Sequence, residues 1–452
     1  MKARIFVVFA LLGAAGLSLA EEPVPTPVEA PVEAPAEAPM AAPAGPRYPV
    51  ERWHVDESTD ALLVRDGRVP LVEMTVQVPV GTYSAWLRES GGEIAWTLQS
   101  YDVDGALRAR ADALAVELYL DVGKNASTLS VRALRRDADA VAQLLHDVLT
   151  SSSIDKAELR RAGKGVRIGW QGNLKDPDFR LSQAMNSLFF VPGDPRLAAY
   201  EEPGKVSKDA KKMLAVRDAM LSLPGRRIGF AGDIDQAEAD RLARLILPPA
   251  GAAPQGAGAV FQEPQGAKPE DHAEKMASLT QIYFALSAMG ISYEDPNYPA
   301  FVVANHVLGG HFFSRLYVAL RHEGGETYGA RARGGGGVEP EVYNLYTFTR
   351  AENRERTEQK LREVLATFQR DGITEEERAD AVSALVGQRL IDLQAPGDAL
   401  DEVLRMDALG LPPDFNDANL RAASALTVEQ INTFIATFYE PSRFTLVTVE
   451  PE

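Results

Sequence analysis

The order of a strand, several long helices and a closing strand occurs twice along this chain, and this repetition constrains its fold most. In the first half, apolar and polar residues alternate from Val72 to Val78, which predicts a half-buried strand, and residues 227–231 predict the closing strand. In the second half, strands are predicted at residues 281–286 and 444–449. Helical periodicity is expected at residues 106–114, 138–149, 181–189, 300–308, 314–320, 356–369 and 375–393.

Duplication of one module of roughly 200 residues explains this layout most simply. We therefore predict an α+β fold of two duplicated domains, each a mainly antiparallel sheet with helices packed on one face. The predicted domains are residues 47–247 and 269–452, joined by a Pro-, Gly-, Ala- and Gln-rich linker at 248–268. Two unrelated α+β domains are the alternative.

The N-terminal 46 residues read as two segments that precede the folded part. Residues 1–20 combine basic residues, an apolar run and a small-residue cleavage site ending at Ala20, which predicts a signal peptide. An uncleaved anchor helix is the alternative, although an apolar run of about 15 residues is shorter than the roughly 20 that span a bilayer. Residues 21–46 are rich in Pro, Ala and Glu and predict a disordered tether. We expect an exported protein, in a bacterial periplasm.

Charge and cysteine content exclude several classes of partner and site. The 47 basic and 64 acidic residues give a net charge of −17, which repels nucleic acid and anionic membrane surfaces. Neither nucleic acid nor stable membrane insertion after signal cleavage is expected. The chain has no cysteine, so disulfides, thiolate zinc sites and cysteine nucleophiles are excluded. Six histidines remain as candidate metal ligands.

A series of short motifs follows one another in a recognisable order. They are Val80-Gly81-Thr82, Phe230-Ala231-Gly232-Asp233-Ile234-Asp235, Gln281-Ile282, Val302 to Gly310, Phe313-Ser314-Arg315-Leu316, Leu320-Arg321-His322-Glu323, Thr327-Tyr328-Gly329 and Leu426 to Ile431. In this order the sequence resembles the pitrilysin/insulinase family, or inverzincins, and more closely its two-domain bacterial and mitochondrial-processing-type branch. The resemblance covers residues 50–452 and implies the same duplicated α+β fold.

The zinc site that active members of this family carry has no counterpart here. Their His-x-x-Glu-His helix supplies two ligands and a general base, and a glutamate roughly 70 to 80 residues later completes the site. Ala95 and Gln99 stand at the histidine positions, Leu98 at the base and Gly169 at the distant glutamate. Because zinc needs N or O donors and a base beside its bound water, we expect no zinc and no cofactor in this chain.

Three histidines in the second half leave one alternative metal site open. His306, His311 and His322 lie near one another in the sequence, together with Glu323 and Glu326. Gly309 and Gly310 lie between the first two histidines and are expected to break their sharing of one helical face. One capping or core histidine and two surface histidines are therefore the ordinary interpretation.

An arginine and a tyrosine seven residues apart remain from the family's second-domain site. In heterodimeric members, the resemblance implies, this pair belongs to the chain without zinc and binds the substrate peptide over the partner's metal. Arg321 and Tyr328 stand at these positions, although Glu326-Thr327 replaces the usual Leu-x before the tyrosine. A guanidinium can bind peptide carbonyls, and a phenol can donate to a developing oxyanion. The alternative is an ion pair of Arg321 with a nearby glutamate and a tyrosine that only packs.

Four glycines, residues 334–337, follow the strand predicted after Tyr328. They permit backbone conformations closed to other residues and predict either a mobile flap or a hairpin loop to the strand at 343–348. Phosphate binding is not expected, because no Gly-Lys-Ser/Thr sequence leads into a helix there.

These features together predict a non-catalytic, substrate-binding subunit of a heterodimeric zinc metallopeptidase. A homologous partner chain would supply the His-x-x-Glu-His site and its zinc. An inactive paralogue with a structural or interaction role is the alternative, but a pure scaffold has no need for the Arg321 and Tyr328 pair. An independent enzyme is disfavoured, because no Gly-x-Ser-x-Gly and no other nucleophile-and-base motif occurs.

Overall fold

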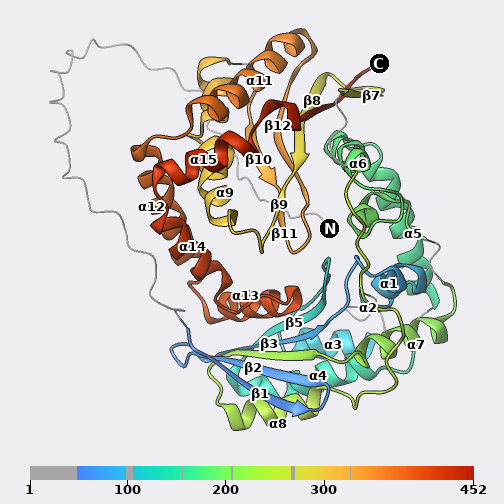
Figure 1. Cartoon of the computed structure of the whole chain (residues 1–452). Coiled ribbons are helices and arrows are strands. Elements are labelled where there is room, and N and C mark those ends of the chain that lie inside the picture. Colours follow the sequence, from blue (N-terminus) through green and yellow to red (C-terminus); the bar gives the residue numbers. More distant parts are fainter. Residues whose placement is uncertain (1–47, 98–104, 155, 205–206, 266–269, 326) are drawn as a thin grey trace, which may run out of the picture. The chain divides into compact units, whose positions relative to one another are not determined.

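The computed structural model describes residues 48–97, 105–154, 156–204, 207–265, 270–325 and 327–452 (Figure 1). The signal peptide expected at residues 1–20 and the tether expected at 21–46 lie outside the described residues. All described residues belong to one compact unit of the chain. Within them, no helix has both the length and the apolar character needed to cross a bilayer.

The first half of the chain forms a six-stranded sheet in the order β1-β2-β6-β3-β5-β4. Its strands are β1 (Val50–Asp56), β2 (Thr59–Arg65), β3 (Leu71–Val78), β4 (Leu118–Val122), β5 (Ser127–Leu134) and β6 (Arg226–Gly232). β2 and β6 are parallel, and the other neighbours are antiparallel. The strands predicted at residues 72–78 and 227–231 are β3 and β6, which are hydrogen-bonded to each other.

The second half forms a five-stranded sheet in the order β10-β12-β8-β13-β7. Its strands are β7 (His272–Met276), β8 (Gln281–Met289), β10 (Ala330–Gly334), β12 (Val342–Arg350) and β13 (Thr445–Pro451). β13 and β7 are parallel and the other pairs are antiparallel. Read from β7, this sheet repeats the order and directions of β2-β6-β3-β5-β4, as a duplicated module does. The predicted α+β class with mainly antiparallel sheets is confirmed.

Helices occupy the sequence between the strands. The first half contains α1 (Ala85–Ser90), α2 (Gly92–Thr97), α3 (Gly105–Ala113), α4 (Ala138–Thr150), α5 (Lys156–Asn173), α6 (Pro177–Phe189), α7 (Ala210–Leu221) and α8 (Gln236–Ile246). The second contains α9 (Tyr298–Asn305), α10 (Arg315–Tyr317), α11 (Arg354–Asp371), α12 (Glu375–Asp392), α13 (Pro396–Leu409), α14 (Phe415–Ala425) and α15 (Val428–Phe438). Side-chain caps fix several starts: Asp235 caps α8, and Thr427 with Gln430 forms the capping box of α15.

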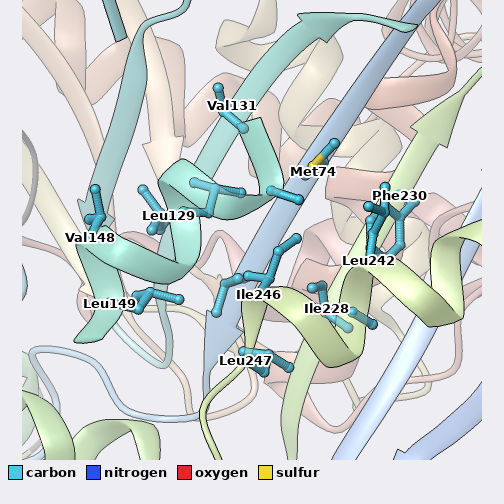
Figure 2. Close-up of a cluster of buried hydrophobic side chains, with 14 of the residues drawn as sticks. Met74, Leu129, Val131, Val148, Leu149, Ile228, Phe230, Leu242, Ile246 and Leu247 are labelled. Atoms are coloured by element: carbon cyan, nitrogen blue, oxygen red, sulfur yellow. The ribbon is translucent and has the colours of Figure 1, made fainter. Parts of the chain in front are cut away.

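The main core of the first half lies between one face of its sheet and helices α4 and α8 (Figure 2). Apolar side chains of the strands, such as Met74 and Phe230, meet Val148 of α4 and Leu242 of α8 there. The second half has a corresponding core between its sheet and helices that include α9, α11 and α15.

A helix from the opposite half covers the other face of each sheet. Leu400 and Leu404 of α13 pack with Leu62 and Val64 of β2. In the reverse direction, Phe189 of α6 packs with side chains of β8 and β13. Residues 61–64 of β2 are all apolar because both faces of the strand are buried. Alternate side chains face α13 on one side and the α4/α8 core on the other. Helices of the same half cover one face of each sheet, as predicted, but a helix of the opposite half covers the other face, which the prediction did not include. Each half therefore helps to close the core of the other.

Candidate functional site

The two described positions of the family's zinc site, Ala95 and Gly169, carry no metal-binding side chain. Ala95 lies in α2, fully buried in an apolar cluster that includes Ile154, Leu159 and Met213. Leu98 and Gln99 lie outside the described residues. Gly169 lies on the exposed side of α5, and no atom lies within 4 Å of the place that a Cβ would take.

These residues do not fit a zinc ion. A methyl group and a hydrogen offer no N or O donor, and the cluster around Ala95 is apolar. In the described ranges, no three His, Asp or Glu side chains come together as a metal site.

The structure brings Arg321 and Tyr328 side by side. Arg321 lies in a π-helical turn, Val318–Glu323, that continues α10. Its guanidinium Nη1 donates a hydrogen bond to the main-chain carbonyl oxygen of Tyr328, 3.4 Å away. The phenol of Tyr328 extends from the backbone with 78% of the residue's surface exposed. The pair therefore offers one guanidinium with further donors and one accessible phenolic hydroxyl.

The turn before β10 holds Tyr328 in this outward position. Thr327 is buried, and its hydroxyl both accepts from the main-chain N–H of Gly329 at 3.1 Å and lies 3.0 Å from the Gly329 carbonyl oxygen. The hydroxyl of Thr347 in β12 donates to the same carbonyl at 3.1 Å. These bonds fix the turn in which Thr327 is buried and Tyr328 is exposed.

Two aromatic residues beside this pair were not singled out from the sequence. The guanidinium carbon of Arg321 lies 5.1 Å from the ring centroid of Tyr317, within the range of a cation–π contact. The ring of Phe312 packs edge-on against the same tyrosine, with centroids 4.9 Å apart. Tyr317 precedes Arg321 by four residues, a helical spacing that places two side chains on one face and could have identified it.

Gly309 departs from helical geometry, with φ −157° and ψ 16°, so the helical face is broken at the glycine pair as expected. The two imidazoles nevertheless lie side by side and stack, with centroids 4.6 Å apart at 18°. Burial, together with the His311 ring, lowers the pKa of His306 to about 4, and burial also lowers the pKa of His311. A metal lies near the plane of each imidazole that binds it, so two nearly parallel rings share no position for one ion.

The glycine-rich segment is a paired hairpin rather than an unanchored loop. Gly336–Gly337 forms β11, which pairs in parallel with β9 (Ile291–Ser292). The main-chain N–H of Ile291 donates to the Gly335 carbonyl at 2.8 Å. A Cβ on Gly335 would lie 2.9 Å from the ring of Phe301, and φ is +88° there, so only glycine fits. The hairpin interpretation accounts for these contacts.

Comparison with known proteins places this fold among peptidase-like chains. Residues 210–385 match the family model described as Peptidase M16 inactive domain. The whole fold resembles the crystal structure of a peptidase M16 inactive domain from Pseudomonas fluorescens, with a TM-score of 0.77 and 21% identity over 89% of this chain and 98% of that one. The resemblance to the pitrilysin/insulinase family drawn from the motifs is confirmed.

Two curated relatives match over a smaller part of the chain. A Bacillus subtilis protein named uncharacterized zinc protease YmxG is 24% identical over 168 residues, which cover 36% of this chain and 41% of the relative. A Helicobacter pylori protein named non-peptidase homolog YmxG is 26% identical over 143 residues, which cover 32% of this chain and 33% of the relative. Each match thus spans less than half of the relative's length.

Proposed function

We propose that this chain, which carries a Peptidase M16 inactive domain and has the fold of a solved M16 protein, is a non-catalytic, substrate-binding subunit of a zinc peptidase. Its partner is a homologous chain with an intact His-x-x-Glu-His motif, which supplies the zinc and the general base. The two chains act together on peptides. Residues 1–20 favour export, and the periplasm is the proposed location.

The geometry of Arg321 and Tyr328 carries this proposal. Arg321 is held by the Tyr317 ring and the Tyr328 carbonyl, so part of the entropy of ordering its long side chain is already lost before a peptide binds. The exposed phenol of Tyr328 can donate to a carbonyl oxygen on which negative charge develops. Neither the guanidinium of Arg321 nor the phenol of Tyr328 can hydrolyse a peptide bond without a metal-bound water. This agrees with a chain whose described zinc-site positions hold no metal ligand.

The test uses the complex with a zinc-motif homologue from the same genome. Tyr328→Phe removes one donor aimed at the developing oxyanion and should lower kcat by about 100-fold. Arg321→Ala removes a peptide-positioning contact and should also raise KM. Tyr119→Phe is the matched control, because Tyr119 is an exposed tyrosine on β4 whose hydroxyl donates to Glu117, and it should leave both constants unchanged. Metal analysis of the separated chains should find zinc in the partner.

Two outcomes would contradict the proposal in different ways. Unchanged rates in both Arg321→Ala and Tyr328→Phe complexes would leave the chain as a structural or interaction paralogue, which the name of the Helicobacter pylori relative also accommodates. One tightly bound zinc per isolated chain would instead show that this chain holds a metal site of its own.

A further inference from the structure

An exposed phenylalanine lies next to the Arg321 and Tyr328 pair. Phe312 has 66% of its surface exposed, although it is among the most apolar side chain types. It is located between the stacked His311 and the start of α10 at Arg315. Most of its ring is therefore available for contact with a bound molecule.

Phe312 is connected to Arg321 through one shared ring. Its edge meets the ring of Tyr317 at a centroid distance of 4.9 Å and an angle of 66°. The guanidinium of Arg321 lies 5.1 Å from the same ring, and it donates onward to the Tyr328 carbonyl. Phe312 and Arg321 thus contact the same ring, and Arg321 in turn contacts Tyr328, so an exposed apolar side chain lies close to the polar pair. Tyr317 itself is buried.

We propose that Phe312 is a specificity-determining residue, which contacts a large apolar side chain of the peptide whose backbone the Arg321 and Tyr328 pair binds. The inference rests on the proposed function and names its substrate class, namely peptides with an aromatic or large aliphatic residue near the bound segment. An extended peptide advances about 3.3 Å per residue, so residues two or three positions apart can reach Phe312 and the pair. Apolar contact with Phe312 then adds affinity that a small side chain does not gain.

The adjacent Phe313 provides the matched control. It is 75% exposed, the same residue type, and one position along the chain. Phe313 lines a cavity of about 470 Å³ between α10 and α11, together with Val318, Lys360 and Val364. Substitution of Phe313 therefore tests whether any exposed phenylalanine in this loop has the same effect.

The experiment measures binding of labelled synthetic peptides to the full chain by fluorescence anisotropy. The probes are an unstructured Ala-Ser-Lys peptide and a series in which one Phe replaces each position in turn. For the wild type we expect at least one position at which Phe tightens binding about tenfold, the size of one good apolar contact. Phe312→Ala should abolish that preference and leave the parent peptide within about twofold. Phe312→Leu should restore most of it, and Phe313→Ala should retain it.

The variants separate failure of this inference from failure of the proposed function. If Arg321→Ala weakens every peptide while Phe312→Ala keeps the full Phe preference, the specificity role is refuted and the binding role stands. If Phe313→Ala removes the preference equally, the assignment to Phe312 is wrong. If the wild type binds none of the peptides, or Arg321→Ala binds them all unchanged, the substrate-binding role fails and this inference with it. Circular dichroism of each variant confirms that the fold is retained.

Discussion

Truncation of Leu400 tests whether the two halves of the chain stabilise each other. Leu400 lies on α13, in the second half, but it is 0% exposed because it packs against the first sheet. Its Cδ1 would be 2.6 Å from a Cβ on Gly229 of β6, so the side chain lies directly on the strand. Leu400→Ala therefore opens a cavity between a helix of one half and the sheet of the other.

The expected cost follows from the atoms removed. Three buried carbon groups at about 0.8 kcal/mol each give about 2.4 kcal/mol, and the cavity raises the loss to about 3 kcal/mol, within the usual range of about 2–5. With an m-value of roughly 6 kcal/mol/M in guanidinium chloride, the unfolding midpoint should fall by about 0.5 M. Ile391→Ala on α12 is the control, because Ile391 is exposed and its truncation should change stability by no more than about 0.5 kcal/mol.

Tryptophan fluorescence is a selective reporter for this experiment. All four tryptophans occur at or before residue 170, and Trp96 is fully buried in the core of the first half. If α13 stabilises the first sheet, Leu400→Ala shifts the tryptophan transition and the circular dichroism transition together. A circular dichroism transition that moves while the tryptophan transition stays at the wild-type midpoint would refute the mutual stabilisation.

Three further changes test individual sites. Burial lowers the pKa of His306 to about 4, below the 6.5 of an unfolded chain, so the folded state is most stable above pH 6.5, where His306 is neutral in both states. The free energy of unfolding should fall as the pH drops from 6.5 toward 4, by about 1 kcal/mol at pH 5 after allowance for partial exposure. Urea midpoints across this range should fall less steeply in His306→Asn, and an identical slope would contradict the assignment. Arg389→Leu leaves the buried Asp417, 2.6 Å away, without this ion-pair partner, removes the nearer of the two arginines at Glu402 and should cost about 3 kcal/mol. Arg370→Leu at an exposed pair should leave the urea midpoint nearly unchanged. Ala95→His forces an imidazole into a fully buried apolar cluster and should cost about 3 kcal/mol, and a rise in its melting temperature on adding zinc would refute our view of this site.

Local features of the sequence were sufficient for much of the fold. The alternation at residues 72–78 and the apolar run at 281–286 became β3 and β8, because side chains alternate across a strand whatever lies far away in the chain. The expectation that Ala95 and Gly169 hold no zinc rests on residue types alone, since neither has a donor in any conformation. Arg321 and Tyr328 are only seven residues apart, so their contact joins near neighbours in the sequence.

Only the tertiary structure decided which distant or reversed segments meet. The sequence showed helices but not that α13 covers the first sheet and α6 the second, because an amphipathic face specifies burial and not the surface that buries it. The stacking of His306 on His311 depends on the backbone at Gly309, whose conformation a glycine leaves open. In the same way, the placement of Phe312 on Tyr317 beside Arg321 depends on how the chain turns before α10. Periodicity determines local structure, whereas packing between elements determines which side chains share a site.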